Sequence, residues 1–412
     1  MSAESRMLIE RAEEELRPVF KRFEETELVC EKRVLEAFHN NRVAARHFNF
    51  STGYGYDDEG RDNLDRIFAE VMQTEAAIVV PQLSSGTHTI FMALAAILRP
   101  NELILSAVGR PYDTLVEAIG IEGNVSGSLK EFGIKYEQIE LTDDGKIDIE
   151  TLKKELIKKH KIVYFQRSRG YAWRNSIMPS DMKPAFDVIK ELSPESIIMV
   201  DNCYGEFTQE NEPTKFGADI IMGSLIKNPG GGIAHTGGYI AGKRELIDIV
   251  ANRVTVPGIG REAGCYPGGY LPYYQGLFLA PHTVCQSLKT AALFACTFER
   301  LGLMSMPSSN ADRSDIVQAL RFKKKEQLID FCRVIQSVSP VDSYVVPEPW
   351  AMPGYTDEVI MAAGTFIQGA SIELTADAPI REPYTAYIQG GLTYAHGRIA
   401  AETVLDSILN ND

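Results

Sequence analysis

A single lysine, Lys227, follows a short apolar run and precedes a segment of Pro and Gly. The run at 219–226 predicts a buried strand, and Pro229 with the glycines at 230–232 prevents regular structure after it. A lysine in this place is either a solvated loop cation or a cation held in a cleft. In a cleft, burial would lower the pKa of Lys227, so that its neutral amine could form a Schiff base. The run alone does not choose between the two readings.

A second feature is the turn Ser84-Ser85-Gly86-Thr87, which separates a predicted strand at 78–80 from a predicted helix at 90–98. Free backbone N–H groups and the positive end of the helix dipole meet at such a turn, which makes it a potential phosphate site. The same pattern also describes an ordinary capped helix.

Two further residues follow predicted strands. Tyr112 comes after the apolar run at 102–107, and Asp201 ends the run at 197–200. These strands alternate with predicted helices and are continuously apolar, which predicts an open, mostly parallel α/β sheet covered on both faces. Functional residues of such sheets gather at the carboxyl ends of the strands. We therefore expect Ser85, Tyr112, Asp201 and Lys227 to share one edge.

Pyridoxal 5'-phosphate needs these four kinds of group. A lysine forms the imine, a turn binds the phosphate, a carboxylate keeps the pyridine nitrogen protonated, and an aromatic ring stacks on the cofactor ring. Asp201 could instead cap a turn, and Tyr112 could belong to the core. The order of the four residues along an α/β chain favours the cofactor reading.

Composition narrows the possible partners. The 412 residues carry a formal net charge of -14, which argues against nucleic acid or an anionic membrane as a partner. The six cysteines lack the spacing of a zinc site or a disulfide framework, and no metal is expected. The N-terminus lacks the apolar core of a signal peptide and no segment is long enough to span a membrane, so a cytoplasmic protein is expected.

The pattern predicts three parts. A helical arm at 1–50 precedes a large α/β domain at 51–275. The third part, at 276–412, consists of a long linking helix from about 275 to 301 and a smaller C-terminal α+β domain. That domain has strands near Val345, Val359 and Ile372 and a last helix at 394–409.

The chain resembles the bacterial methionine gamma-lyase family, often called aluminium-resistance proteins, within the cystathionine-lyase branch of pyridoxal-phosphate enzymes. The resemblance runs over most of the chain. It is carried by four segments: Gly53-Tyr54-Gly55-Tyr56-Asp57-Asp58, Gln166-Arg167-Ser168-Arg169-Gly170-Tyr171, Val200-Asp201-Asn202-Cys203-Tyr204-Gly205-Glu206-Phe207, and Gly223-Ser224-Leu225-Ile226-Lys227-Asn228-Pro229-Gly230-Gly231.

The resemblance implies an aspartate-aminotransferase-like fold and a role for each site residue. Lys227 would be the Schiff-base lysine and Asp201 the partner of the pyridine nitrogen, while Tyr112 would stack on the ring. The phosphate would be bound by Ser85, Gly86, Thr87 and Ser224. The loop that carries Tyr56 would reach the phosphate of a neighbouring subunit, so a homodimer or homotetramer is expected.

Three positions depart from the family pattern. The usual Tyr-x-Arg of that loop is Tyr56-Asp57-Asp58 here, and Arg61 is a candidate for the missing cation. Ile226 replaces a hydroxyl residue before the lysine. In this branch an arginine near the C-terminus binds the substrate carboxylate, and no matching segment is present here. Arg381 is the candidate, and the alternative is that Arg381 is an ordinary surface arginine.

The resemblance implies elimination of a thiol from a sulfur-containing amino acid such as cystathionine, cysteine or methionine. Lys227 would remove the Cα proton, and Tyr112 or Tyr56 would protonate the leaving thiol. An aminotransferase or aldolase would use the same cofactor residues. A non-catalytic stress protein that binds the cofactor, or a hard cation at Asp57, Asp58 and Glu59, is a further alternative.

Overall fold

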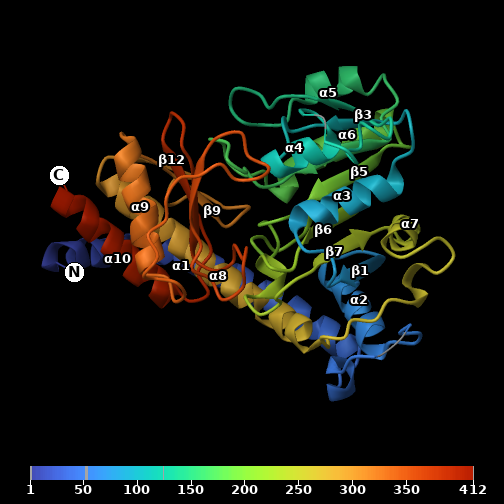
Figure 1. Cartoon of the computed structure of the whole chain (residues 1–412), viewed down its shortest axis with the longest axis horizontal. Helices are drawn as coiled ribbons and strands as arrows, with labels where there is room; N and C mark the ends of the chain where they lie inside the picture. Colours follow the sequence, from blue (N-terminus) through green and yellow to red (C-terminus); the bar gives the residue numbers. More distant parts are fainter. Residues whose placement is uncertain (1, 52–53, 124, 412) are drawn as a thin grey trace.

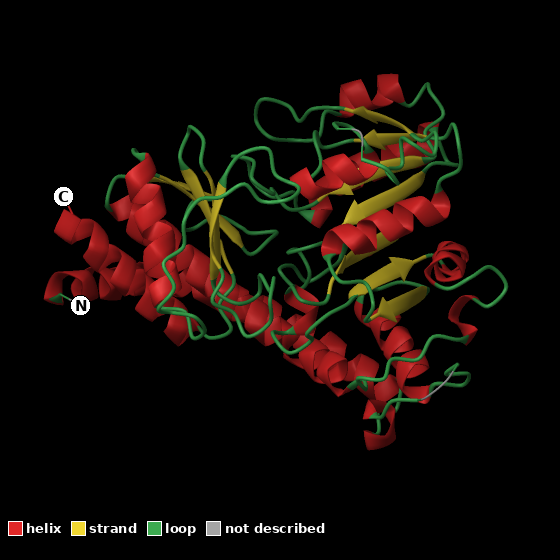
Figure 2. Ribbon diagram, in the orientation of Figure 1, coloured by secondary structure: helices red, strands yellow, loops and turns green. Residues whose placement is uncertain are grey.

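We describe the protein from a computed structural model, which covers residues 2–51, 54–123 and 125–411. Two sheets lie on one side of a long helix, α8 (Leu271–Arg300), which passes from the larger sheet to the smaller one (Figures 1 and 2). The N-terminal helix α1 (Ala3–Asn40) is one continuous helix and packs along α8. Both chain termini lie at the same end of the molecule (Figure 1).

The larger sheet, called the large sheet below, has seven strands in the order β1-β7-β6-β5-β4-β2-β3. The strands β3, β2, β4, β5 and β6 are parallel neighbours, whereas β7 is antiparallel to both β6 and β1. The prediction of a mostly parallel sheet is confirmed. The strands are β1 (Ala76–Val80), β2 (Leu103–Ser106), β3 (Lys135–Gln138), β4 (Ile162–Gln166), β5 (Ile197–Asp201), β6 (Ile220–Ser224) and β7 (Gly238–Gly242).

Helices cover both faces of the large sheet (Figure 2). Successive side chains of a strand point to opposite faces. On β4, Val163 and Phe165 therefore join one apolar cluster, while Ile162 and Tyr164 join another. This double burial explains the continuous apolar runs in the sequence. The helices here are α2 (Glu59–Val71), α3 (Gly86–Ile97), α4 (Asp113–Ile119), α5 (Ile149–Glu155), α6 (Pro179–Leu192) and α7 (Arg244–Val254).

The smaller sheet, called the small sheet, has five antiparallel strands in the order β10-β11-β12-β9-β8. The helices α9 (Lys325–Ser337) and α10 (Tyr394–Asn411) complete this part of the molecule. The strands are β8 (Met304–Met306), β9 (Val317–Arg321), β10 (Val359–Ala362), β11 (Thr375–Pro379) and β12 (Thr385–Gln389).

The C-terminal strands were the least accurate part of the prediction. Strands are found at Val359 and, three residues beyond Ile372, at Thr375–Pro379, but the strand predicted near Val345 was wrong, because that residue lies in a connecting loop. Ile372 is buried in a loop, where its carbonyl accepts a bond from the Gly391 N–H at 2.8 Å. An apolar position held by a loop in this way has the same signature as a short strand.

Helix α8 begins at Leu271, four residues before the predicted position. Within the described ranges, no helix has both the length and the apolar composition needed to cross a bilayer.

Candidate active site

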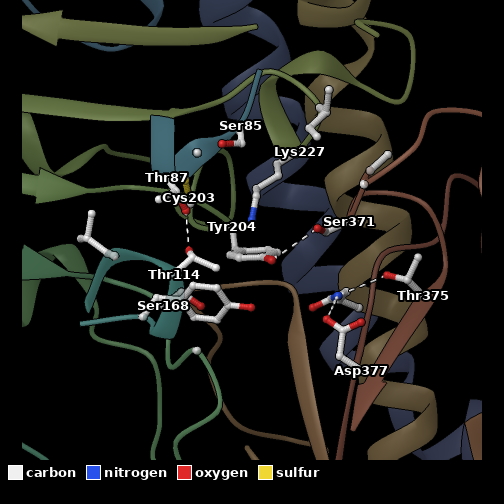
Figure 3. Close-up of a pocket in the computed structure, with 18 of the residues that line it drawn as sticks. Ser85, Thr87, Thr114, Ser168, Cys203, Tyr204, Lys227, Ser371, Thr375 and Asp377 are labelled. Carbon is white, nitrogen blue, oxygen red and sulfur yellow. Dashed lines mark hydrogen bonds between the residues drawn. The ribbon is translucent and has the colours of Figure 1, made fainter. Parts of the chain in front are cut away.

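A cavity of about 390 Å³ lies between the carboxyl-terminal edge of the large sheet and the small sheet. Its large-sheet floor is formed by residues that follow strands: Ser84, Ser85, Gly86, Thr87, Tyr112, Asp201, Cys203, Tyr204 and Lys227. Its small-sheet wall is formed by Met361, Ala363, Thr365, Gln368, Gly369, Ala370, Ser371, Thr375, Asp377 and Gln389. Figure 3 shows Lys227 extending toward the ring of Tyr204, with Thr375 and Asp377 on the wall.

Lys227 lies three residues after the end of β6, and its neighbour Asn228 fixes the turn. The Asn228 side-chain amide donates to the carbonyls of Tyr204 and Glu206, each at 2.9 Å. These bonds tie the lysine segment to the loop after β5. They place the Lys227 Nζ 3.5 Å from the centroid of the Tyr204 ring, a cation–π contact.

The predicted lowering of the Lys227 pKa was wrong. Burial does lower it, but Tyr204, Cys203 and Asp201 act in the opposite direction and prevail, so that the pKa lies above its ordinary value. Nearby groups that can carry negative charge stabilise the ammonium form of Lys227, and here their effect outweighs that of desolvation. The motif around Lys227 did not reveal this, because its partners come from the loop after another strand.

Asp201 ends β5 and is almost fully buried. Its carboxylate accepts a bond from the Cys203 backbone N–H at 3.0 Å and from the Tyr164 hydroxyl at 3.3 Å. Burial nevertheless raises the pKa of Asp201. A cation beside this carboxylate would stabilise its ionised form, which is the property required of a partner for a protonated ring nitrogen.

The predicted phosphate turn lies at the start of α3. Ser85 is the N-cap, and its hydroxyl accepts from the His88 N–H at 3.1 Å. Helix N-termini leave backbone N–H groups without an intrahelical partner. The absence of a side chain at Gly86 keeps this turn open, because a Cβ there would lie 2.9 Å from the Cys203 Sγ. The Thr87 hydroxyl is 2.5 Å from that of Thr114.

Ser224, the last residue of β6, supplies an independent observation. Its hydroxyl oxygen is buried and has no hydrogen-bond partner among the described residues. The Ser224 Cβ lies 3.6 Å from the position that a Cβ added at Gly86 would take, so the serine faces the phosphate turn. An unpartnered buried hydroxyl is costly, and a ligand that accepts from it would remove that cost. The donor set therefore fits a phosphate, and together with Lys227 and Asp201 it fits pyridoxal phosphate.

Tyr112 lies at the start of α4, with its backbone N–H bonded to the Gln166 side chain at 2.7 Å. Its hydroxyl is 2.9 Å from that of Tyr355, and burial raises its pKa well above the ordinary value. Tyr112 therefore stays protonated at neutral pH, so its hydroxyl is not available as a base.

Three residues that the sequence assigned to the site, namely Tyr56, Arg61 and Arg381, lie outside the cavity. Tyr56 is 59% exposed and stacks on Tyr54, with ring centroids 5.4 Å apart. Arg61 is buried at the start of α2, where it bonds Asp62 and the Gly55 carbonyl. Gly53, the first residue of this tyrosine motif, lies outside the described residues.

Arg381 is the third residue that the structure does not bring into the cavity. Its side chain is 47% exposed and pairs with Asp357 at 2.7 Å. Among the described residues that line the cavity there is no arginine, and Lys227 is the one cation.

Sequence reasoning missed several cavity residues. Tyr204 belongs to the quoted Asp201 segment, and its spacing of three from Asp201 was an available signal. Its φ of +70° is a left-handed backbone conformation, which is uncommon for a non-glycine residue and brings its ring over Lys227. The missed residues of the wall, Asp377 and Gln389 foremost, carry no local motif.

Two of the three acidic residues considered for a hard cation, Asp58 and Glu59, have structural roles. Asp58 caps α2 and accepts from Ser51 and Tyr270, while Glu59 pairs with Arg46. A second acidic group, Glu137 with Glu155 and His160, could hold a metal ion by distance, with ligand atoms within 4.8 Å of one another. There the Lys158 ammonium already donates to both glutamates.

Known proteins similar to this chain have been found by sequence and by structure. An uncharacterized protein of Bacillus subtilis, YnbB, is 50% identical over 96% of this chain and 94% of its own length. The crystal structure of a carbon-sulfur lyase involved in aluminum resistance, from Clostridium novyi, is 47% identical, with a TM-score of 0.95 over 99% of this chain and 96% of that chain.

A more distant structure tests the fold alone. The pyridoxal-5'-phosphate dependent protein YhfS from Escherichia coli is 14% identical, with a TM-score of 0.63 over 95% of this chain and 97% of that chain. The predicted aspartate-aminotransferase-like fold is confirmed. Residues 5–409 match the methionine gamma-lyase family, and the chain belongs to that family.

Proposed function

We propose that this protein is a pyridoxal-phosphate-dependent carbon–sulfur lyase that releases a thiol, a 2-oxo acid and ammonia from a sulfur-containing amino acid. The observation that carries the proposal is the convergence of Lys227, Asp201 and the turn at Ser85 to Thr87 on one cavity. The buried Ser224 hydroxyl, unpartnered among the described residues, lies beside that turn, next to Gly86. The carbon–sulfur lyase from Clostridium novyi supports the reaction type.

Pyridoxal phosphate, when bound, supplies an electron sink for the charge that develops when the substrate loses its Cα proton. Ser85, Gly86, Thr87 and Ser224 would hold its phosphate, and Asp201 would keep a proton on its ring nitrogen. Tyr112 would lie against its ring.

Lys227 would be both the residue to which the cofactor is attached and the general base. Its raised pKa makes the amine a strong base once its own proton has left. The Cα proton then moves to the Nζ of Lys227. The carbon–sulfur bond breaks, with its electron pair leaving on sulfur, and Tyr112 gives a proton to the thiolate. Addition of water to the remaining carbon–nitrogen fragment yields the 2-oxo acid and ammonia.

The reaction is tested by incubating the cofactor-loaded protein with cystathionine, cysteine and methionine separately, without any acceptor keto acid. We expect 2-oxo acid and ammonia in equal amounts from at least one of them. Release of 2-oxo acid only when an acceptor is added would identify an aminotransferase instead. No turnover of any of the three would contradict the proposed substrate class.

We further propose that the protein is a cytoplasmic homodimer or homotetramer in which the Tyr56 loop completes a neighbouring site. Two observations support the assembly: Tyr54 and Tyr56 form an exposed stacked pair, and the described cavity lining contains no arginine for the phosphate. Light scattering should give at least twice the monomer mass. A Tyr56→Ala variant that kept full cofactor affinity would contradict this role for Tyr56.

A further inference from the structure

Asp377 is a carboxylate on the small-sheet wall that the proposed chemistry does not use. It lies on β11 and lines the cavity. The Gln389 side-chain amide donates to its Oδ2 at 3.1 Å and to the Thr375 hydroxyl at 3.2 Å, which fixes the orientation of the carboxylate (Figure 3).

This carboxylate has no cation in contact with it among the described residues, and Lys227 acts on it only through its charge. Within the described part of the chain, no lysine, arginine or histidine forms an ion pair with it. Lys227 is the cation of the cavity, and the proposed function assigns it to the cofactor. Asp377 is partly withdrawn from water. A carboxylate in such a place without a cation is costly, so its natural ligand is a positively charged group.

The surroundings of Asp377 reinforce this conclusion. The other polar side chains of the wall, among them Thr365, Gln368 and Ser371, are neutral. The Tyr171 and Gln389 side chains act on the Asp377 carboxyl as neutral hydrogen-bond donors, so neither supplies a positive charge. A carboxylate whose hydrogen-bond donors are neutral keeps acceptor positions for an ammonium group.

We propose that the thiol released by this enzyme bears a primary amino group, whose ammonium binds Asp377 while the other end of the substrate is held at Lys227. This inference rests on the proposed lyase function and defines its substrate class: amino-acid thioethers with a second, distal amine, of which cystathionine is one. Methionine and other thioethers with uncharged ends are then poor substrates.

The preference depends on pH. Burial raises the pKa of Asp377 to about 6. The carboxylate is therefore ionised at pH 8 and becomes protonated as the pH falls through 6, so the preference for an ammonium disappears in acid. The titratable groups that act on Asp377 or feel its charge are Lys227, Tyr112, Tyr171, Tyr355 and Cys332, and the raised pKa values of the phenols and the thiol keep them uncharged over this range.

The test uses two substrates of nearly equal shape, S-(2-aminoethyl)-L-cysteine and S-propyl-L-cysteine, with the cofactor-loaded enzyme. At pH 8 the wild type should have a kcat/KM at least about tenfold higher for the aminoethyl compound, the scale of a hydrogen bond to a charged group. Asp377→Asn should bring the two values within about threefold by lowering the aminoethyl value alone. Asp377→Glu keeps the charge and should retain part of the preference.

A matched control is Asp330→Asn, which removes an exposed carboxylate from α9, outside the cavity, and should leave the preference unchanged. Equal kcat/KM values for the two thioethers in the wild type would overturn the inference. Equal losses for both compounds in Asp377→Asn, in a variant with unchanged thermal stability, would also overturn it, because they would point to proton transfer by Asp377.

Failure of the proposed function would be recognisable separately. If neither compound is turned over, their dissociation constants can be measured by calorimetry without interference from reaction. Tighter binding of the aminoethyl compound that is lost in Asp377→Asn would then support the role of Asp377, and equal binding would refute it.

Discussion

The two sides of the cavity are built differently. Each reactive group of the large-sheet floor follows a strand whose neighbours fix its position: Asp201 is in register with Gln166 on β4 and Met222 on β6. The small-sheet wall is antiparallel, and much of it comes from the loop between β10 and β11. Strand ends fixed by their neighbours suit the precise positioning of a cofactor, whereas a wall made largely of loop suits substrate recognition.

The largest effect is expected at the centre of the floor. Lys227→Ala should reduce kcat by at least on the order of 10³-fold, because it removes both the attachment point and the general base. The measurement is 2-oxo acid release by the purified variant. Lys215→Ala, at an exposed lysine of the short 3-10 helix Pro213–Phe216, is the control and should keep full activity. Substantial activity in Lys227→Ala would assign the base to another residue.

A smaller loss is expected at Asp201. Asp201→Asn keeps the shape of the site but no longer stabilises a protonated ring nitrogen, so kcat should fall on the order of 10²-fold. The cofactor should still attach to Lys227, which an unchanged visible absorption of the loaded variant would show. An unchanged kcat would mean that the electron sink does not depend on this carboxylate.

Ser224→Ala separates cofactor binding from folding. Loss of one hydroxyl donor to the phosphate should weaken cofactor affinity by about 1.5 kcal/mol, or roughly tenfold. The thermal stability of the cofactor-free protein should not fall, because this hydroxyl has no partner among the described residues. In contrast, Ser106→Ala breaks a buried bond to the Gly109 carbonyl and should destabilise the fold. A cofactor affinity unchanged by Ser224→Ala would place the phosphate elsewhere.

The smallest effect is expected at Tyr355, a cavity residue that contacts Tyr112 of the floor. Tyr355→Phe removes the hydroxyl 2.9 Å from that of Tyr112 without changing ring packing. We expect a loss of about 1 kcal/mol, or roughly fivefold in kcat/KM. Cofactor affinity should stay the same. A loss of cofactor affinity instead would show that Tyr355 belongs functionally to the floor.

This contrast also explains what the sequence could predict. The residues at 84–87, 201 and 224–227 could be placed together because each follows an apolar strand, and parallel strands bring their carboxyl ends to one edge. Asp377 could not be found in this way. It is a single carboxylate in a strand of the small sheet, and its position opposite Lys227 depends on the packing of the two sheets across α8.

Two errors have the same physical origin. The lowered pKa expected for Lys227 assumed burial alone, whereas Tyr204 and Cys203 arrive from a loop of another strand and reverse the shift. Arg381 was selected because a carboxylate anchor was required near the C-terminus, but its exposed side chain pairs with Asp357 outside the cavity. Both depend on which side chains meet through space, and this is set by tertiary packing.

The most direct test of the account is to locate the cofactor on the chain. The protein should be loaded with pyridoxal phosphate, reduced with borohydride, digested and analysed by mass spectrometry. We predict a single added cofactor mass on the peptide that contains Lys227, and none in Lys227→Ala. A cofactor mass on a different lysine, or on no peptide of a fully loaded protein, would contradict the assignment of this cavity as the active site.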